Sequence, residues 1–263
     1  MQNAGLAALG LNWRYLAFDV HPDNLRAAIQ GAQAMDFVGL NLTVPHKLLA
    51  VEMVDVLHEE ARNWGAVNTI RFEGNRSHGF NTDADAIARA LREDLGMDLD
   101  GARVLLLGAG GAGRTAALKI AAEGAAELFL VNRTPSKADV LASEIRERYP
   151  RVKVASGYPS GPVDLMLNAT SLGLKPQDPL PVDEQQYALR RAAAVYDMIY
   201  RPAETPLLKA AKTAGCRVAN GLSMLLYQGT AALELWTGKP APVEIMRQAL
   251  EQNVYGPRTP VPE

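Results

Sequence analysis

Lys47 is the side chain in the first half of the chain whose type and place best suit proton-transfer chemistry. It closes the polar run Asn41-Leu-Thr-Val-Pro-His-Lys47, which leaves an expected strand over residues 37–42. Pro45 allows a helix to start there, and polar side chains at the carboxyl end of a strand lie where open α/β sheets usually hold ligands. A lysine partly removed from water can exchange protons near neutral pH. Taken alone, the pattern still favours an ordinary surface lysine.

A glycine-rich turn between two apolar runs is the second chemical feature. The runs Val104–Leu107 and Leu128–Val131 predict strands buried on both faces, with a helix over residues 115–123 between them. The glycines of the turn complete a G-x-G-x-x-G pattern: Gly108, Gly110 and Gly113. They permit a tight turn, close approach of a pyrophosphate and close helix packing, and the helix N-terminus offers N–H groups to phosphates. We expect a dinucleotide-binding βαβ unit rather than a purely structural turn.

The residues after the second strand indicate which dinucleotide is bound. An NAD site usually carries Asp or Glu about 20 residues beyond the glycines, to bind the ribose 2′-hydroxyl. This chain has Asn132-Arg133-Thr134 there, with Lys137 close behind. Cations suit a 2′-phosphate, which a carboxylate would repel, so the cofactor is predicted to be NADP. The alternative is that both cations are ordinary solvated charges, although cations at a helix N-terminus oppose its dipole.

Strands and helices alternate along most of the chain, which predicts an α/β fold. Asp83 stands directly before a clearly amphipathic helix, where a helix N-cap is its ordinary interpretation. The other expected elements that bear on the site are strands over Trp13–Val20, Asp164–Asn168, Ala194–Ile199 and Arg217–Asn220, and helices over residues 84–95, 135–148, 205–214, 225–236 and 243–252.

Bulk properties exclude several classes of protein. The 263 residues suffice for one large or two ordinary domains, and the net charge of −2 offers no electrostatic reason to bind nucleic acid or an anionic membrane. No apolar run approaches the roughly 18 residues of a membrane span. A single cysteine, Cys216, excludes an internal disulfide and fits a reducing compartment. We expect a cytoplasmic protein without a metal centre. The sequence leaves open whether it forms a homodimer.

Motifs along nearly the whole chain together resemble the shikimate dehydrogenase family. In order they are Asn41–Lys47, Gly65-Ala-Val-Asn-Thr69, Gly79-Phe-Asn-Thr-Asp83, Gly108–Arg114, Asn132-Arg-Thr134, Asn168-Ala-Thr-Ser-Leu-Gly173, Tyr196-Asp-Met-Ile-Tyr200, and Gly221-Leu-Ser-Met-Leu225 with Gln228. Each motif alone is weak. The resemblance implies NADPH-dependent reduction of 3-dehydroshikimate to shikimate, a step of aromatic amino-acid biosynthesis on the way to chorismate.

The resemblance also implies roles for particular residues. Lys47 and Asp83 match the family's catalytic pair, and the chemistry agrees: hydride transfer to a ketone develops alkoxide charge, which a lysine can protonate while a carboxylate orients it. The residues expected to bind substrate are Thr43, Lys47, Asn68, Asp83, Tyr200 and Gln228. Those expected to bind the cofactor are Gly108, Gly110, Gly111, Ala112, Gly113, Asn132, Arg133, Thr134, Lys137, Thr170, Met198, Gly221 and Met224.

The family fold implies two α/β domains separated by a cleft. Residues 1–82 with 221–263 would form the substrate domain, and residues 83–220 the Rossmann-type NADP-binding domain. Members of the family carry a strand and a paired-serine motif before the point where this sequence starts, and those serines bind the substrate carboxylate. We expect that the start has been assigned too late, because the downstream site residues are kept. The alternative is a truncated, non-catalytic NADP-binding protein.

Two other enzymes compete with this interpretation. A quinate/shikimate dehydrogenase using NAD shares the motifs, but Arg133 and Lys137 argue against NAD. Methylenetetrahydrofolate dehydrogenase is another two-domain NADP enzyme with a catalytic lysine. Its site needs aromatic room for a pterin, whereas only 6% of this chain is aromatic.

Overall fold

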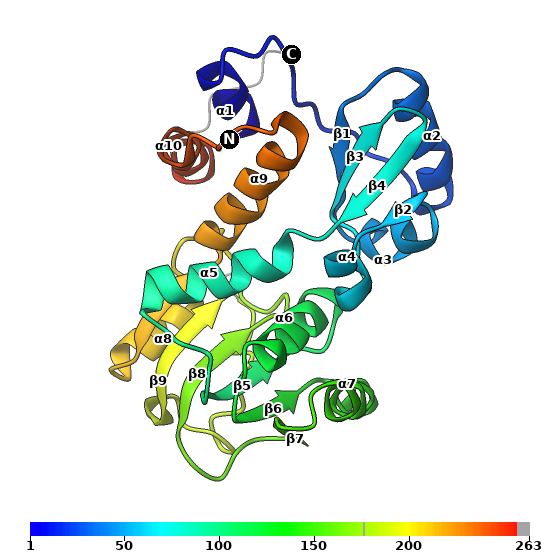
Figure 1. Cartoon of the computed structure of the whole chain (residues 1–263). Coiled ribbons are helices and arrows are strands. Elements are labelled where there is room, and N and C mark those ends of the chain that lie inside the picture. The colour runs from blue at the N-terminus through cyan, green and yellow to red at the C-terminus, as the bar shows by residue number, and fades with distance from the viewer. Residues whose placement is uncertain (176, 257–263) are drawn as a thin grey trace. The chain divides into compact units, whose positions relative to one another are not determined.

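The computed structural model describes residues 1–175 and 177–256 of the chain (Figure 1). They form two compact units: the first contains Met1–Asp83 and the chain from Leu226 onward, and the second contains Ala84–Leu225. The sequence-based limits were 1–82 with 221–263, and 83–220. The second boundary between the units therefore lies between Leu225 and Leu226, inside helix α9 (Leu222–Thr237), and not before that helix. One helix thus contributes its first turn to the second unit and the remainder to the first.

A parallel sheet forms the centre of the second unit. Its six strands, counted over the described residues, run in the order β10-β9-β8-β5-β6-β7. The order reverses between β5 and β8, which makes the carboxyl ends of these two strands a topological switch point. The strands span Arg103–Leu107 (β5), Glu127–Val131 (β6), Lys153–Ser156 (β7), Val163–Asn168 (β8), Ala192–Asp197 (β9) and Arg217–Asn220 (β10).

Apolar burial explains why these segments form strands. Val104–Leu107 is at most 1% exposed, as a parallel strand covered on both faces requires. One core cluster joins Leu105, Met166 and Val195 of three adjacent strands to Leu208 of a helix. The helices of this unit are α5 (Asp83–Leu95), which begins at the last residue of the first unit, α6 (Gly111–Ala122), α7 (Pro135–Arg148) and α8 (Pro206–Thr213), with a short 3-10 turn at Leu189–Arg191.

Helix α6 begins inside the glycine pattern, earlier than the predicted residue 115. Gly113 lies against Gly108, and a Cβ built on it would be 2.0 Å from the Gly108 carbonyl oxygen. Gly113 makes this contact from the first turn of the helix. The helix therefore begins at Gly111, before the residue that touches the end of β5. The two glycines thereby fix the distance between strand and helix.

The first unit has a smaller, mixed sheet in the order β1-β3-β4-β2. Strands β1 (Gly39–Asn41) and β4 (Arg76–Phe80) pair antiparallel with β3 (Thr69–Glu73), and β2 (Val56–Leu57) pairs parallel with β4. Leu25, Ile29, Ala50, Val67 and Ile70 form its core cluster. The helices are α1 (Gln2–Ala8), α2 (Leu25–Ala34), α3 (His46–Leu49), α4 (Glu59–Trp64), α10 (Val243–Tyr255) and most of α9, with 3-10 turns at Pro22–Asn24 and Ala50–Glu52.

The predicted strand over Trp13–Val20 is wrong. In the described part of the chain these residues join neither sheet. Leu16 and Phe18 are 65% and 62% exposed. A strand exists only through backbone hydrogen bonds to a neighbouring strand, whereas the main-chain N–H and carbonyl of Tyr15 bond to the Asn3 side chain at 2.7 and 3.0 Å. The segment therefore has the composition of a strand without the ladder that would make it one.

Candidate active site

Lys47 and Asp83 form an ion pair in the first unit. Lys47 Nζ lies 2.8 Å from Asp83 Oδ2, and the two side chains retain 29% and 11% of their exposure. Partial burial makes their attraction stronger than that of a fully solvated pair. An ammonium group carries three N–H donors, and within the described residues the side chain of Lys47 has Asp83 as its one hydrogen-bond partner. Donors therefore remain for the oxygen of a ligand.

The backbone holds both members of the pair in place. Lys47 lies in α3, and its carbonyl accepts a hydrogen bond of 2.8 Å from the Val67 N–H, just before β3. Asp83 is the first residue of α5, and its N–H donates to Asn81 Oδ1 at 3.1 Å. A carboxylate in the first turn of a helix is favoured by the helix dipole. A short helix and the start of a longer one thus present opposite charges to each other.

Asn68 and Thr82 form a buried network beside the pair. Asn68 is 1% exposed; its Nδ2 donates to Thr82 Oγ1 and its Oδ1 accepts from the Thr82 N–H, both at 2.9 Å. Thr82 Oγ1 in turn donates to the main-chain carbonyl of Gln228 at 3.0 Å. Because Thr82 directly precedes Asp83, these bonds position the carboxylate and tie it to α9. The Asn68 side chain is therefore already engaged with the protein.

The remaining predicted substrate residues lie in three different places. Thr43 is exposed in the turn before α3, where its carbonyl accepts from the His46 N–H at 2.8 Å. Gln228 is half-buried on α9 in the first unit. Tyr200 is half-buried and belongs to the second unit, between β9 and α8. Hydrogen bonds join Lys47 to Asp83, and Asn68 through Thr82 to the main chain of Gln228.

Sequence reasoning missed two residues of this network. Thr82 links Asn68 to α9, and Thr69 Oγ1 donates to Asn68 Oδ1 at 3.1 Å. Both stand inside motifs that carry the family resemblance, next to the residues that were singled out. Their position in those motifs was the available signal, but a threonine has too many ordinary roles to be chosen from its type.

The glycine-rich turn in the second unit has the shape of a phosphate cradle. Gly108 has a φ of +104°, and the exposed Gly110 and Gly111 have nothing within 4 Å of a Cβ position. The first N–H groups of α6 have no partner inside the helix. Open space above unpaired amides at a helix N-terminus suits an anion. Together with the exposed Ala112, these residues fit the pyrophosphate of a dinucleotide.

Asn132 joins the glycine turn to the end of β6. Its Oδ1 accepts from the Ala109 N–H at 3.0 Å, and its Nδ2 donates to the Thr134 carbonyl at 2.9 Å. Arg133 and Lys137 are exposed, and in the described part of the chain neither takes part in an ion pair. Lys137 lines a hollow of about 280 Å³, together with Ala109, Arg114, Ser136, Val140, Leu141 and Glu144. Two exposed cations without carboxylate partners, one of them beside a hollow, are suited to a phosphate.

The other predicted cofactor residues follow β8 and β9 or open α9. Thr170 lies over the glycine turn, with its Cγ2 3.0 Å from a Cβ built on Gly108. A Cβ on Gly221 would lie 2.1 Å from the Met198 carbonyl oxygen, so only glycine fits there. Met224 is half-buried in the first turn of α9. The structure therefore places Thr170 against Gly108, and Met198 against Gly221.

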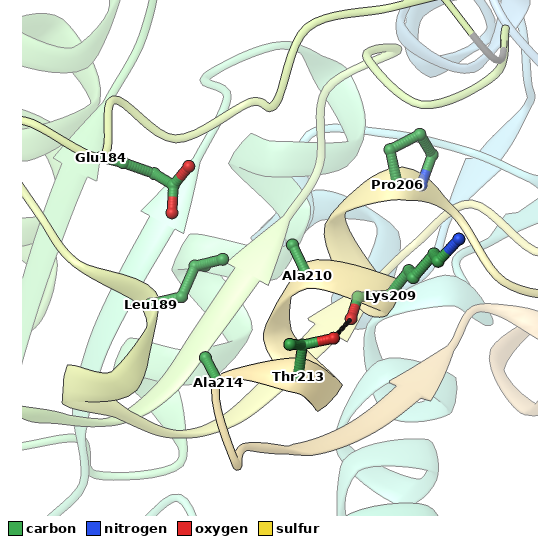
Figure 2. Close-up of a pocket in the computed structure, with 7 residues that line it drawn as sticks. All are labelled: Glu184, Leu189, Pro206, Lys209, Ala210, Thr213 and Ala214. Carbon is green, nitrogen blue, oxygen red and sulfur yellow. Dashed lines mark hydrogen bonds between the residues drawn. The ribbon is translucent and has the colours of Figure 1, made fainter.

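A second hollow of the second unit has none of the predicted site residues in its lining. Figure 2 shows it on the surface of α8, with a volume of about 500 Å³. Its lining residues are Glu184, Leu189, Pro206, Lys209, Ala210, Thr213 and Ala214. The drawn hydrogen bond runs from the Thr213 hydroxyl to the Lys209 main chain, within the helix. The hollow is open and mainly apolar and has no paired acid and base, so catalysis is not assigned to it.

Two features that would change the class of the protein do not occur in the described residues. No helix there has both the length and the apolar character to cross a membrane. No three His, Cys, Asp or Glu side chains in that part of the chain gather in a way that suits a metal ion.

Three family models match successive parts of the chain. They describe the shikimate dehydrogenase substrate binding domain (residues 1–70), shikimate/quinate 5-dehydrogenase (residues 89–157) and the shikimate 5′-dehydrogenase C-terminal domain (residues 221–251). The first covers Lys47 and Asn68, the second the glycine turn, and the third Gln228. The matched segments therefore contain parts of both candidate sites.

Individual proteins are similar over almost the full chain. The NADP(+) shikimate dehydrogenase of Methanopyrus kandleri is 41% identical over 97% of this chain and 90% of its own length. A solved shikimate 5-dehydrogenase of Thermus thermophilus, in complex with NADP(H) and shikimate, is 34% identical, covers 95% of this chain and 92% of its own, and has a TM-score of 0.84. The ligand-free 5-ketofructose reductase of a Gluconobacter strain reaches 35% identity, 95% and 91% coverage and the same TM-score.

Proposed function

Because this chain belongs to the shikimate dehydrogenase family, we propose that it is an NADP-dependent shikimate dehydrogenase. The reaction is the reversible reduction of 3-dehydroshikimate to shikimate. The observation that carries the proposal is the Lys47–Asp83 pair, with 2.8 Å between Nζ and Oδ2. A ketone that accepts a hydride needs a proton on its oxygen, and this pair places an ammonium donor beside an orienting carboxylate.

When NADPH is bound it supplies the hydride, and residues of the chain supply the proton and bind the substrate. Lys47 donates a proton to the carbonyl oxygen as alkoxide charge develops there, and its ammonium is restored from solvent. Asp83 holds that ammonium in place and stays ionised. In the reverse direction Lys47, as the neutral amine, accepts the hydroxyl proton. Thr43, Asn68, Gln228 and Tyr200 are proposed to bind the substrate hydroxyls.

The second unit is proposed to hold NADP. Gly108, Gly110, Gly111, Ala112 and Gly113 surround the pyrophosphate, because their Cβ-free or small positions leave the α6 amides accessible. The 2′-phosphate is assigned to Asn132, Arg133, Thr134 and Lys137, whose two cations have no carboxylate partner among the described residues. The nicotinamide end is assigned to Thr170, Met198, Gly221 and Met224.

The family description supports a second candidate substrate. One matching model is named for shikimate and quinate together, and a similar solved structure is a 5-ketofructose reductase. Each of these names implies a polyhydroxylated substrate with a ketone, and the same lysine would protonate the ketone oxygen as hydride is added. Initial rates with shikimate and quinate, each with NADP and with NAD, separate the candidates. Faster turnover of quinate with NAD would replace the proposed activity.

The decisive experiment follows absorbance at 340 nm with 3-dehydroshikimate and NADPH. Lys47→Ala is expected to lower turnover by roughly 100-fold or more. The affinity for NADPH should stay within about twofold of the wild type, because the residues assigned to the cofactor belong to the second unit. Lys209→Ala is the matched control, since Lys209 is an exposed lysine on α8. Unchanged turnover in Lys47→Ala would remove this residue from the mechanism, and NADPH binding without any turnover in the wild type would support a non-catalytic NADP-binding protein.

A place in aromatic amino-acid biosynthesis and a cytoplasmic location belong to the same proposal. The first follows from the substrate, and the second is supported by the single cysteine, which fits a reducing compartment. Cell fractionation tests the location. Light scattering on the purified protein decides between a monomer and the homodimer that the sequence leaves open.

A further inference from the structure

A fully buried carboxylate ends strand β9. Asp197 is 0% exposed, and three groups donate hydrogen bonds to it. Thr205 Oγ1 lies 2.6 Å from Oδ2, while Asn168 Nδ2 and the Ile199 N–H lie 3.0 and 3.1 Å from Oδ1. Among the described residues no Lys, Arg or His forms an ion pair with it. Burying a carboxylate costs free energy. A buried aspartate is therefore expected where its hydrogen bonds hold neighbouring groups that an apolar side chain could not hold.

The direction of each bond identifies the charged form. The Thr205 hydroxyl accepts from the Leu208 N–H at 3.3 Å, so its proton points to Asp197. Asn168 Oδ1 accepts from Thr170, which fixes its Nδ2 toward Asp197. All three partners thus donate, as a carboxylate requires. Burial raises the pKa of the Asp197 carboxyl, and the hydrogen bonds from Thr205, Ile199 and Asn168 act in the opposite direction.

Asn168 carries the network into the next loop. It is 0% exposed at the end of β8, directly beside Asp197 in the parallel register. Its Oδ1 accepts from the Thr170 hydroxyl at 2.7 Å and the Thr170 N–H at 3.0 Å, and its Nδ2 also approaches the Leu172 carbonyl at 3.2 Å. The loop that follows β8 is thereby bonded to the end of β9.

Thr205 carries the network in the other direction. It is the N-cap of α8 and is completely buried, so its bond to Asp197 closes the loop that runs from Met198 to the start of that helix. The Ile199 N–H binds the same carboxylate, and the Ile199 carbonyl accepts from the Gly221 N–H at 3.3 Å. One side chain therefore fixes both ends of the loop that holds Met198 and Tyr200.

We propose that Asp197 is a positioning residue for the nicotinamide end of the cofactor site. It joins the loops that follow β8 and β9, and these loops contain Thr170, Met198 and Tyr200 and contact Gly221. The inference rests on the proposed function, because these residues were assigned to cofactor and substrate through it. The pyrophosphate and 2′-phosphate residues, on the glycine turn and after β6, make none of the three bonds to Asp197.

Because the three hydrogen bonds to the Asp197 side chain join the loops at the nicotinamide end of the site, its substitution should weaken binding of that end of the cofactor selectively. Asp197→Asn keeps the shape but turns an NH₂ group toward neighbours that donate, so at least one bond is lost. We expect the dissociation constant of NADPH to rise by roughly tenfold, whereas that of adenosine 2′,5′-bisphosphate stays within about twofold. Isothermal titration calorimetry measures both ligands. The bisphosphate contains the adenosine half of the cofactor without a nicotinamide, so it reports on the other end of the site.

Three further variants control the experiment. Asp164→Asn alters an exposed aspartate of β8 that accepts from the Arg103 N–H at 2.8 Å, near the opposite end of the strand. It should leave both dissociation constants unchanged. Thr205→Val removes one donor to Asp197 and should repeat the selective loss, whereas Thr205→Ser keeps the hydroxyl and should restore NADPH binding. This pair keeps the test valid if Asp197→Asn does not fold.

The outcomes separate the two proposals. If wild-type protein binds neither ligand, the proposed NADP function is wrong, and the role of Asp197 fails with it. If the wild type binds both, and Asp197→Asn or Thr205→Val weakens neither or weakens both equally, the proposed function stands and the inference is overturned. Selective loss of NADPH, rescued in Thr205→Ser, supports it.

Discussion

The pair proposed for catalysis in the first unit, Lys47 and Asp83, would act through side chains, whereas the glycine turn proposed to hold the cofactor in the second unit presents main-chain groups. In the first case the proposed chemistry depends on two charges 2.8 Å apart. In the second it depends on positions where no side chain may stand, such as Gly113, whose Cβ would lie 2.0 Å from the Gly108 carbonyl oxygen. A conservative change of functional group should therefore damage the first site, and a single added methyl group should damage the second.

Removing the negative charge of the pair should have the largest effect. Asp83→Asn keeps the size of the side chain but cannot hold the Lys47 ammonium by charge. We expect turnover to fall by roughly 100-fold, with NADPH affinity within about twofold of the wild type. Steady-state rates at 340 nm and calorimetric titration with NADPH measure the two quantities.

Asp85→Asn is the matched control in the same helix. Asp85 pairs with Lys119 at 2.7 Å and its side chain is 74% exposed, so its removal should leave turnover unchanged within about twofold. Equal turnover in Asp83→Asn and wild type would show that the carboxylate does not take part in the reaction.

Adding one methyl group to the glycine turn is expected to be the next largest change. Gly113→Ala forces a Cβ against the Gly108 carbonyl, and overpacking of this kind costs about 1–3 kcal/mol. The dissociation constant of NADPH should rise by roughly tenfold or more. Denaturant unfolding measures the loss of stability and calorimetry the loss of affinity.

Gly31→Ala is a contrasting variant, in which the added methyl group should not lower stability. Gly31 lies inside α2, and nothing stands within 4 Å of its Cβ position. Alanine there should leave stability unchanged or raise it by up to about 1 kcal/mol. If Gly113→Ala proved equally harmless, the close approach of α6 to β5 would not limit the cofactor site.

The cations after β6 should contribute a smaller, selective effect. The double variant Arg133→Ala with Lys137→Ala is expected to weaken NADPH by roughly tenfold, and to leave NADH within about twofold, because NADH lacks the 2′-phosphate. Replacing the exposed Arg151 and Lys153, near β7, by alanine controls for total charge. Equal weakening of both dinucleotides would contradict the assignment to the 2′-phosphate.

The smallest expected effect is a pH dependence in the first unit. His58 Nε2 lies 3.2 Å from His78 Nδ1, and its ring stacks on Phe80 with centroids 3.9 Å apart. Burial, and then the charge of His78 and of Arg71, lower the pKa of His58, against the opposing charges of Glu60 and Glu73. The folded state thus binds fewer protons than the unfolded state just below the ordinary value of 6.5.

The sign of the pH effect follows from that difference. The contribution of His58 to stability is full above about pH 6.5 and is lost as pH falls through the lower pKa of the folded state. The Tm should therefore drop between about pH 7.5 and 5.5, and His58→Gln should show a smaller drop, although its Tm at pH 7.5 is lower because the ring stack is gone. Identical pH slopes in the two proteins would exclude this histidine as the cause.

Local patterns predicted most of the second unit well. Residues 104–107 and 128–131 are strands, as their apolar runs predicted. The first is buried on both faces, whereas the second buries Leu128 and Leu130 and leaves Phe129 and Val131 half-buried, so its predicted burial on both faces is only partly correct. Arg217–Asn220 and Pro135–Arg148 match their predicted limits. The first unit was harder, since α4 and β2 are short and have no strong period, and since residues 13–20 have the composition of a strand without a ladder partner.

The sequence by itself determined the chemical inventory: a lysine after a strand, a glycine-rich turn, and cations where an NAD site would have a carboxylate. These signals are local, because they depend on residue type and on spacing within one turn or strand. Only the tertiary structure decided which distant residues meet. Lys47 reaches Asp83 because the β3–β4 hairpin returns the chain to α3, and Asp197 binds Asn168 because β8 and β9 are parallel neighbours. No local pattern specifies such pairings, since many chain paths would satisfy the same hydrophobic periods.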